Sequence, residues 1–171
     1  MPENVSMRIL DQNQIKQKTK RLAIEILEQN YDFDEIVVAG INNNGYGFAK
    51  MICRYMRPIT PEKKITLARI HLDPANPLGS PISINKKDEE IRDKMLIVVD
   101  DVANSGRTLF YACRPFMEVL PAKLQVAVLV NRKHKTFPIS VDFKGLELAT
   151  TLQENIKVDI LDVDELEVHL V

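Results

Sequence analysis

Four short apolar runs constrain the fold of this chain more than any other sequence feature. They are rich in Val, Ile, Leu and Ala, and they cover Glu35–Gly40, Lys64–Leu72, Lys94–Asp100 and Gln125–Val130. Continuous apolar runs of this length are typical of strands that are buried on both faces. Because helical patterns lie between such runs, the connections are expected to be right-handed crossovers. The sequence therefore predicts an α/β fold with a central, mainly parallel, twisted sheet flanked by helices.

Apolar residues recur at helical spacing in three segments: 11–30, 48–57 and 106–120. Asp11 and Gln14 form a variant of the capping box at the start of the first segment. We expect the second helix to stop before Pro58, because the residue before a proline disfavours the helical conformation. Pro115 falls inside the third helix, where we expect a kink or an early end. Two shorter strands are expected later in the chain: 139–143 and 156–160.

The charge balance excludes a strong global attraction to nucleic acid or to a membrane surface. The 171 residues include 23 basic and 24 acidic ones, and the formal net charge is -1. No signal peptide opens the chain and no apolar run is long enough to span a bilayer, so we expect a single cytoplasmic domain over residues 1–171. Cys53 and Cys113 lie in apolar, helix-like segments, which favours reduced, buried thiols.

A long polar stretch follows the second apolar run, from about residue 73 to residue 90. It is rich in proline, polar and charged residues, and it is long for a loop in a compact domain. Such a loop is often a mobile lid that excludes water from the site it covers. A loosely packed surface loop without a role at the site fits the composition equally well.

The segment IVVDDVANSGRTL, Ile97–Leu109, carries the clearest chemical signal. A buried strand ends in Asp100 and Asp101, and ligands of open α/β sheets bind beyond this end of the strands. The turn that follows offers backbone N–H groups, and Ser105 and Thr108 add hydroxyls suited to a phosphate. Two adjacent carboxylates suit the hydroxyls of a sugar or a Mg²⁺ ion. A plain strand–turn–helix is the alternative, but two carboxylates without partners at a buried strand end would be costly.

This segment resembles the signature of the type I phosphoribosyltransferases: a hydrophobic strand, two acidic residues, a short loop and Thr/Ser-Gly-Arg/Lys-Thr. The resemblance implies that Asp100 and Asp101 are catalytic, hold the ribose hydroxyls and meet Mg²⁺, directly or through hydroxyls or water. It implies the type I fold, with a flexible lid over about 73–90 and a small hood formed by the N-terminal segment and about 131–160. The 5′-phosphate of phosphoribosyl pyrophosphate would be held by Ala103, Asn104, Ser105, Gly106, Arg107 and Thr108.

The resemblance extends over nearly the whole chain to the PyrR family, which are pyrimidine-operon attenuation regulators and also uracil phosphoribosyltransferases. The matching segments are LDQNQIKQKTKRLAIEILEQN, GINNNGYGFAK, ITLAR, LQVAVLVNRKHKTFPISVDFKG and ENIKVDILDVDEL. This implies transfer of a phosphoribosyl group to a nucleobase, with uracil giving UMP and pyrophosphate, Mg²⁺ as cofactor, and a homo-oligomer. Two alternatives stay open: a nucleotide-responsive RNA-binding regulator with weak or no transferase activity, and a ligand-binding module that lost catalysis.

The loop after the first strand departs from the family pattern Gly-Ile-Lys-Thr-Arg-Gly. Here it reads Gly40-Ile41-Asn42-Asn43-Asn44-Gly45, and the resemblance makes Ile41–Gly45 the pyrophosphate loop. Backbone amides remain, but both cations are absent, and each charge-assisted contact is worth about 1.5–3 kcal/mol. The alternative is a loop that only starts a helix, since Asn tolerates a strained turn.

Three further positions bear on the choice of RNA and of base. Ile24 stands where the regulators usually carry a histidine tied to RNA binding, so RNA is a disfavoured partner. Asn104 replaces an aspartate that purine enzymes place near the base nitrogen, and a carboxamide cannot accept that proton. Asn131 replaces a lysine that reads the purine oxygen. Both asparagines argue against hypoxanthine and guanine, and Asn131 is an expected base contact.

Arg69 and Phe143 complete the expected site. Arg69 matches the arginine before the mobile loop and is expected to reach pyrophosphate as a catalytic residue, with an exposed surface ion pair as the alternative. Phe143 matches an aromatic position near the base, although a core aromatic fits equally well. His71 and His134 have no partners at ligand-like spacing, so we expect them to be ordinary polar residues.

Overall fold

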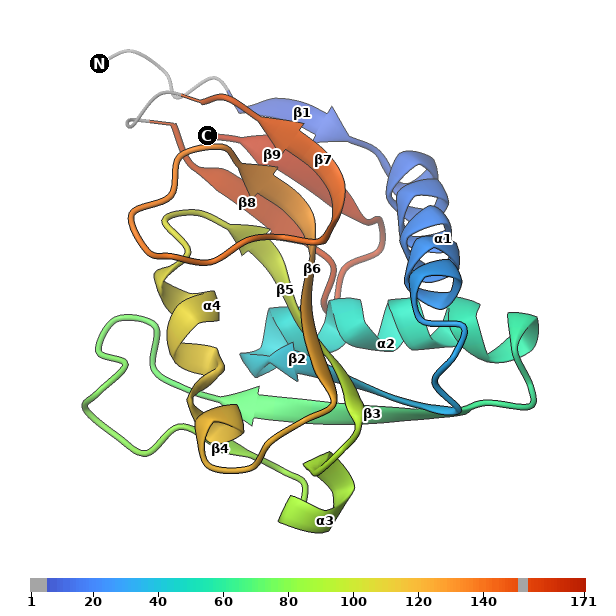
Figure 1. Ribbon diagram of the computed structural model, residues 1–171. Helices are drawn as coiled ribbons and strands as arrows, with labels where there is room; N and C mark the ends of the chain where they lie inside the picture. The colour runs from blue at the N-terminus through green and yellow to red at the C-terminus, as the bar shows by residue number, and fades with distance from the viewer. Residues whose placement is uncertain (1–5, 151–153) are drawn as a thin grey trace.

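A six-stranded sheet forms the centre of the protein (Figure 1). The computed structural model describes residues 6–150 and 154–171. In sheet order the six strands are β4 (Ser83–Ile84), β3 (Lys64–His71), β2 (Glu35–Ile41), β5 (Met95–Ala103), β6 (Lys123–Arg132) and β7 (Phe143–Leu148). All neighbouring pairs are parallel except β3 with β4. The expected α/β fold with a mainly parallel sheet is confirmed.

The strand order reverses between β2 and β5. The chain adds β3 on one side of β2, then returns to place β5 on the other side and continues outward through β6 and β7. In an open parallel sheet such a switch point leaves a crevice at the carboxyl ends of the two central strands. The carboxyl end of β5 is Asp100–Ala103, so the fold itself directs this segment to the crevice.

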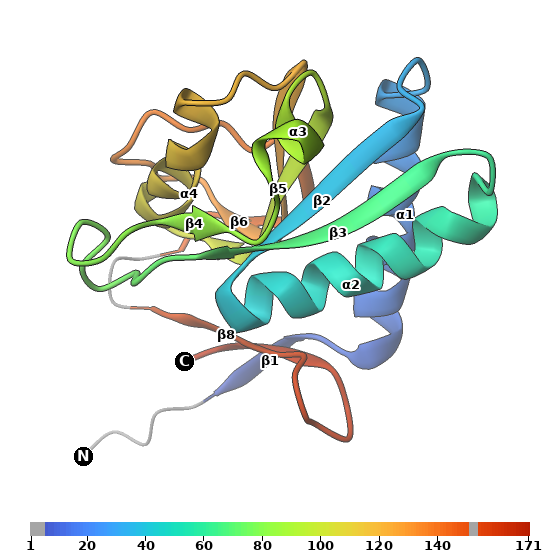
Figure 2. The same cartoon turned by 90° about the horizontal axis from the view of Figure 1, so that it is seen from below.

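Helices cover both faces of the sheet (Figure 2). The long helices α1 (Gln12–Gln29) and α2 (Asn42–Ile59) pack on one face, where every second strand residue joins their core. The other face is covered by three short helices: α3 (Asp88–Ile91), α4 (Arg107–Ala112) and the 3₁₀ helix η1 (Arg114–Met117). Because side chains alternate along each strand, the two cores use alternate residues of β2, such as Val38 and Val37.

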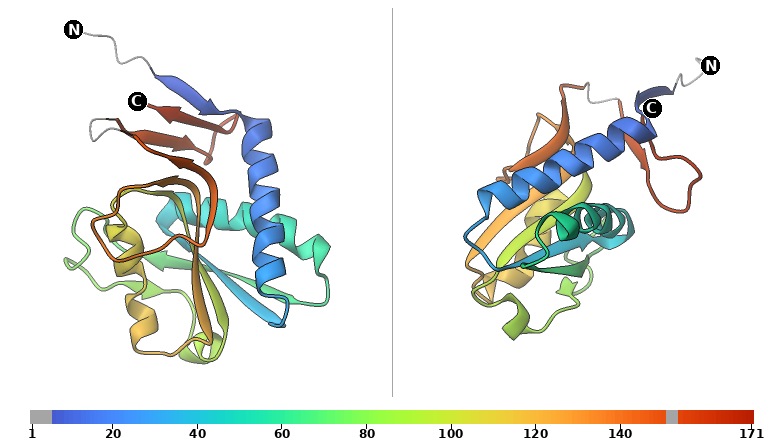
Figure 3. Two further views of the ribbon diagram at one scale, coloured as in Figure 1. Left: turned by 45° about the horizontal axis from the view of Figure 1, so that its top comes forward. Right: turned by 90° about the vertical axis from the view of Figure 1, so that its right-hand side faces the viewer.

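A second, three-stranded antiparallel sheet lies beyond the carboxyl end of the large sheet (Figure 3). It contains, in order, β1 (Met7–Leu10), β9 (Glu167–Leu170) and β8 (Ile156–Asp159). β8 forms its edge and contacts β5 of the large sheet. Segments from both ends of the described chain therefore form a hood above the crevice, while residues 143–148 belong to the large sheet.

Several boundaries differ from those expected. The expectation that the second helix stops before Pro58 is wrong: α2 runs to Ile59, because a proline in the last turn removes a single hydrogen bond. Pro115 does end the third helix early, since α4 stops at Ala112 and Pro115 lies in η1. The expected strand over 139–143 is also wrong, because only Phe143 joins the sheet, as the first residue of β7. None of the helices in the described residues is both long and apolar enough to cross a membrane.

The long polar segment after β3 contains more regular structure than its composition suggests. β4 returns along β3, pairing Ile84 with Ile70, and α3 follows shortly before β5. Asn85 fixes this return, because its side-chain oxygen accepts the Arg69 N–H at 2.7 Å and its own N–H donates to the Arg69 carbonyl at 3.1 Å. The longest irregular part of the segment covers residues 72–82, and a shorter one covers residues 85–87.

Candidate functional site

Asp100 and Asp101 lie side by side at the carboxyl end of β5. The Asp100 carboxylate accepts the Asp101 N–H at 2.9 Å, and the Asp101 carboxylate accepts the Val102 N–H at 2.8 Å. Burial raises the pKa of Asp100 well above its usual value, and the neighbouring Asp101 charge adds to the shift. A pair of acids in this state stabilises a positive charge or donates and accepts hydrogen bonds with hydroxyl groups.

The first turn of α2 closes one side of the acid pair. The Asn44 Nδ2 donates to Asp101 Oδ2 at 2.9 Å. The Asn42 amide is tied to the end of β3, because it donates to the Leu72 carbonyl at 2.8 Å and accepts the Leu72 N–H at 3.1 Å. Asn42 has φ of 52°, a left-handed conformation that Asn adopts more readily than most residues. The expected pyrophosphate loop is thus the start of α2, and hydrogen bonds of Asn42 and Asn44 hold it to the ends of β3 and β5.

No side chain caps the N-terminus of α2 within the described chain. The first N–H groups of an 18-residue helix therefore have no intrahelical acceptors, and together with the helix dipole they favour an anion. Gly45 keeps this turn close to the acid pair, because a Cβ there would lie 2.7 Å from the Val99 carbonyl oxygen. The helix terminus can bind a phosphate group without any lysine or arginine.

The loop after β5 folds around a small niche of about 40 Å³ whose walls are the consecutive residues Val102–Leu109. Gly106 has φ of 86°, which only glycine adopts without strain, and this turns the chain into α4. The Ser105 carbonyl accepts the N–H groups of Thr136 and Phe137 at 2.9 and 3.2 Å, which fixes the loop from outside. The niche has room for one compact group such as a phosphate, so we refer to it as the phosphate niche and to residues 102–109 as the phosphate loop.

Two cavities meet above the acid pair. One, of about 300 Å³, joins the phosphate niche to the start of α2 and is lined by Ile41, Asn42, Asn44, Pro74, Asp100, Asp101, Val102, Asn104, Thr108 and Ile156. The other, of about 350 Å³, lies under the hood and is lined by Asn44, Asp101 and Ile156–Leu161. Asn44, Asp101 and Ile156 line both. The arrangement places an acid pair between a phosphate niche, an uncapped helix terminus and a chamber large enough for a small ring.

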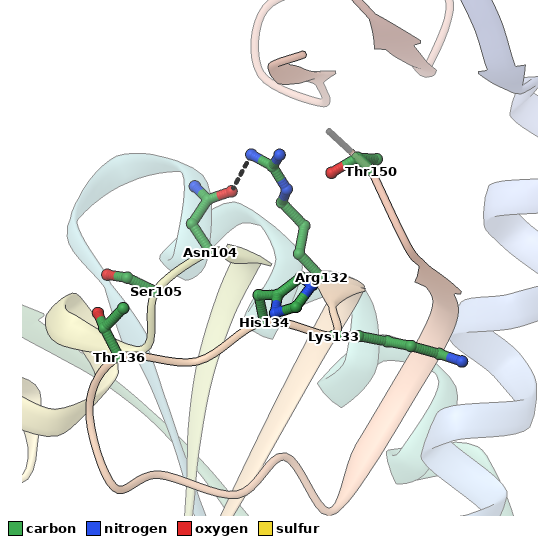
Figure 4. A pocket seen from close by; sticks show the side chains of 7 residues that line it. All are labelled: Asn104, Ser105, Arg132, Lys133, His134, Thr136 and Thr150. Carbon is green, nitrogen blue, oxygen red and sulfur yellow. Dashed lines mark hydrogen bonds between the residues drawn. The ribbon is translucent and has the colours of Figure 1, made fainter. Parts of the chain in front are cut away.

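A third cavity, of about 230 Å³, adjoins the phosphate loop on its outer side (Figure 4). Asn104, Ser105 and Thr136 stand on one side of it, and Arg132 and Thr150 on the other. The Arg132 guanidinium donates to Asn104 Oδ1 at 3.3 Å, so the loop after β6 is joined to the phosphate loop across this cavity. Lys133 and His134 complete a lining with several basic groups.

Two of the expected site residues lie elsewhere. Arg69 does not line the cavities above the acid pair, because its guanidinium carbon lies 4.0 Å from the ring centre of Tyr46 on α2. This stacking also differs from the surface ion pair considered as the alternative. Phe143 is fully buried in the core beneath α1 and offers no ring face to a ligand. The expectation that Phe143 contacts the base is therefore corrected: as the first residue of β7 it points into the packed face of the sheet.

Asn131 lies at the end of β6, and both polar atoms of its side-chain amide are hydrogen-bonded. Its Nδ2 donates to Glu147 Oε2 at 3.1 Å, and its Oδ1 accepts from Lys135 Nζ at 2.8 Å. Burial lowers the pKa of Lys135, and the nearby Glu147 charge partly offsets the effect. Asn131 thus supports the loop after β6, and each polar atom of its side chain already makes a hydrogen bond within the protein.

Sequence reasoning named neither Ile156 nor Pro74 as a residue that lines the cavity at the acid pair, although both lie in the segments expected to form the hood and the lid. Ile156 begins β8, and the resemblance of the segment ENIKVDILDVDEL was the signal that pointed there, although it assigned no role to a single residue. Pro74 is held at the cavity because its carbonyl accepts the Arg107 guanidinium at 2.6 Å. The 72–82 segment is therefore anchored to the phosphate loop.

The acid pair suits Mg²⁺ as a partial ligand set. Within residues 6–150 and 154–171, no cluster of three or more His, Cys, Asp or Glu side chains could hold a metal by itself. Mg²⁺ in phosphate-transfer sites is typically held by one or two carboxylates, with substrate oxygens and water completing the shell. A cation here would also offset the mutual repulsion that helps to raise the pKa of Asp100.

Comparison with known proteins assigns this site to a class. The chain belongs to the phosphoribosyl transferase domain family, whose sequence profile matches residues 6–161. It is 32% identical over 163 residues to the bifunctional protein PyrR of Clostridium beijerinckii, covering 91% of each chain. It is 34% identical over 168 residues to the bifunctional protein PyrR of Bacillus pumilus, covering 92% of each chain. The expected kinship with type I phosphoribosyltransferases and PyrR proteins is confirmed.

Solved structures confirm the fold. A hypoxanthine-guanine phosphoribosyltransferase from Bacillus anthracis matches with a TM-score of 0.68 at 22% identity, covering 82% of this chain and 81% of that one. The hypoxanthine phosphoribosyltransferase of Trypanosoma cruzi matches with a TM-score of 0.73 at 15% identity, covering 94% of each chain. At these identities the likeness concerns the fold alone.

Proposed function

We propose that this phosphoribosyltransferase transfers the phosphoribosyl group of phosphoribosyl pyrophosphate to uracil, giving UMP and pyrophosphate. One observation carries the proposal: the Asp100–Asp101 pair lies between a phosphate-sized niche and the uncapped N-terminus of α2, with a chamber beside it. The donor has the matching order of groups, since its ribose lies between a 5′-phosphate and a pyrophosphate. Its 5′-phosphate fits the Val102–Leu109 niche, and its pyrophosphate fits the start of α2.

The acid pair would hold the ribose and stabilise the charge that develops on it. As the bond to pyrophosphate breaks, positive charge grows on the sugar, and fixed carboxylates beside it lower the energy of that state. Asp101 is held for this task by Asn44 and by the Val102 N–H. Bound Mg²⁺, held by Asp100 and Asp101 with substrate oxygens, would neutralise the departing phosphates.

The acceptor base would enter the chamber under the hood. β8 lies at the edge of its sheet, so its outer backbone N–H and C=O groups are available to a ligand in the chamber that it lines. An imide such as uracil carries a donor between two acceptors, which a strand edge can match. Asn131 and Asn104 stand where purine enzymes have a lysine and an aspartate. Neither asparagine carries the charge that would favour a purine, and both side chains already form hydrogen bonds within the protein.

Turnover of phosphoribosyl pyrophosphate with a panel of bases tests this function. With Mg²⁺ present, uracil should give UMP at a rate at least about 100-fold above that with hypoxanthine or guanine. An Asp101→Asn variant is the matched control for background hydrolysis, because it keeps the shape of the side chain and removes its charge. Faster turnover with a purine would refute the choice of base, and no nucleotide with any base would refute the enzyme.

A second candidate function is a nucleotide-responsive RNA-binding regulator. The basic cavity beside the phosphate loop favours it, because Arg132, Lys133 and His134 there offer an anion a site next to bound nucleotide. Binding of a pyrimidine-operon leader RNA should then weaken steeply with salt and respond to UMP. A Lys133→Gln variant should reduce both effects, whereas Lys20→Gln on α1 serves as the control. Binding that is insensitive to UMP would refute this candidate.

The proposal also includes self-association and action in the cytoplasm, where phosphoribosyl pyrophosphate is available. Met117 and Leu120, which are 69% and 76% exposed near the end of η1, offer an apolar surface that a second copy could cover. Light scattering at micromolar concentration should give the mass of a dimer or larger assembly. A Met117→Lys/Leu120→Lys variant that stays assembled would exclude this surface as the interface.

A further inference from the structure

A cavity of about 260 Å³ lies on the side of α2 that faces α1 and the hood, apart from the acid pair. Its walls come from the first turns of α1, from α2 and from the turn that joins β8 to β9. That turn lies at the same end of the molecule as the start of α1 (Figure 3), and the Leu166 N–H donates to Gln12 Oε1 at 3.2 Å. Three separate elements therefore fix the shape of this cavity.

The rim of the cavity has an excess of positive charge. Lys16, Lys50 and Arg54 line it, and Asp162 is the acidic residue of the lining. Within residues 6–150 and 154–171 none of these three cations forms an ion pair, and Lys50 has only a contact of 5.3 Å with the Tyr46 ring. One carboxylate cannot balance three cations, so the cavity attracts an anion.

The floor of the cavity is apolar. Met51 and Tyr55 lie one turn apart on α2, and both pack against the core. Leu166 closes the opposite side from the turn after β8. An apolar floor beneath a charged rim suits a ligand with a ring or short chain at one end and an anionic group at the other. The volume fits a small molecule rather than a peptide or a nucleic acid.

Leu161 forms the wall between this cavity and the chamber under the hood, because it lines both. Gly47 permits this position: a Cβ on Gly47 would lie 2.5 Å from Leu161 Cδ2. The close approach of the turn to α2 therefore separates the two spaces. A ligand in the outer cavity and a base in the chamber would contact opposite sides of one side chain without competing.

We infer that the cavity between α1, α2 and the β8–β9 turn is a second ligand site, which takes a small organic anion with an apolar body. Lys50 and Arg54 bind its phosphate or carboxylate group, and Met51 and Tyr55 contact its body. The site is separate from the Val102–Leu109 phosphate niche, and it does not depend on catalysis by the acid pair.

Calorimetric titration of the full-length chain with 1-naphthyl phosphate tests this inference. Saturating ribose 5-phosphate is present throughout, so that the phosphate niche is filled. We expect one equivalent to bind, and a Lys50→Gln/Arg54→Gln variant to bind at least about 10-fold more weakly. Lys20→Gln/Arg92→Gln is the control, because it removes one exposed lysine and one exposed arginine outside the cavity. 1-Naphthoate and neutral 1-naphthalenemethanol distinguish a phosphate, a carboxylate and purely apolar binding.

Four outcomes would overturn the inference. Binding that occurs only in a parallel titration without ribose 5-phosphate would place the probe in the phosphate niche. Equal weakening in both double variants would show a general charge effect, and equal affinity for 1-naphthalenemethanol would remove the role of the cations. Lack of binding by the unaltered chain would refute the site outright. The altered side chains are exposed, so thermal unfolding of both variants should match that of the unaltered chain.

Discussion

The Asn44 amide donates to the Asp101 carboxylate at 2.9 Å and so joins the start of α2 to the end of β5. α2 packs against β5, which brings the start of the helix to the end of the strand. A neutral amide satisfies one carboxylate oxygen without neutralising its charge. Position 44 therefore controls both the acid pair and the region proposed for pyrophosphate.

An Asn44→Arg variant should strengthen donor binding. It restores a cation where the family pattern has one, and a charge-assisted contact of about 1.5–3 kcal/mol corresponds to roughly a 10-fold or larger decrease in KM for phosphoribosyl pyrophosphate. Asn43→Arg is the matched control, because Asn43 is exposed and does not line the cavity at the acid pair. Steady-state kinetics with uracil measures both. An unchanged KM in Asn44→Arg would contradict the assignment of this turn to pyrophosphate.

Asp100→Asn should separate stability from activity. Burial and the Asp101 charge raise the pKa of Asp100, so an ionised carboxylate at this position destabilises the folded state at neutral pH. The amide removes that cost, and we expect a higher free energy of unfolding together with a loss of activity of about 100-fold or more. Urea denaturation and turnover measure the two effects. A lower free energy of unfolding in the variant would show that the protein already compensates the charge of the Asp100 carboxylate.

The same residue predicts a specific pH dependence of stability. The folded state keeps a proton on Asp100 at pH values where the unfolded chain, with a pKa near about 3.9, has lost it. The folded state then binds more protons, so its stability falls as pH rises from the unfolded pKa through the folded pKa. In the Asp100→Asn variant, this contribution to the change of unfolding free energy with pH should vanish, as urea denaturation at several pH values would show. Asp32→Asn, at an exposed position, should keep it.

The sequence was sufficient to predict the sheet and to place the acid pair at the end of its central strand. Buried parallel strands have nearly continuous apolar runs, and β5 ends in two adjacent aspartates followed by a short polar turn. The strands and the acid pair are therefore both encoded in short local stretches of sequence. The N-terminal cap of α1 was equally clear, because Asp11 and Gln14 form both bonds of the capping box. These features depend on residues that are neighbours in the chain.

Features that depend on distant contacts could not be predicted in this way. Arg69 stacks on Tyr46, and the Asn131 amide is taken by Glu147 and Lys135, through contacts between different elements. From the sequence alone, Phe143 fits a base contact and a core position equally well. The register of β7, which decides between them, is set by pairing with β6. The short strands β1 and β9 have only four residues each, too few to show a period.

Arg107 should hold the 72–82 segment near the site. Its guanidinium donates to the Pro74 carbonyl at 2.6 Å, and an Arg107→Gln side chain is too short to keep this bond. We expect limited proteolysis within the segment to become several-fold faster, because protection depends on the free energy of local opening. Arg114→Gln, at an exposed position on η1, is the control. Equal cleavage of all three proteins would show that other contacts hold the segment.

Gly106→Ala should disturb the phosphate loop in two separable ways. A residue with a Cβ is strained at φ of 86°, and that Cβ would lie 2.4 Å from Ile139 Cγ2. Together these effects should lower the free energy of unfolding by about 1–3 kcal/mol. A Gly106→Ala/Ile139→Leu double variant removes the branched methyl and relieves the contact but not the backbone strain. A double-mutant cycle by urea denaturation should therefore recover part of the loss, and the part that remains measures the cost of the turn itself. Full recovery would mean that the loop does not need glycine for its conformation.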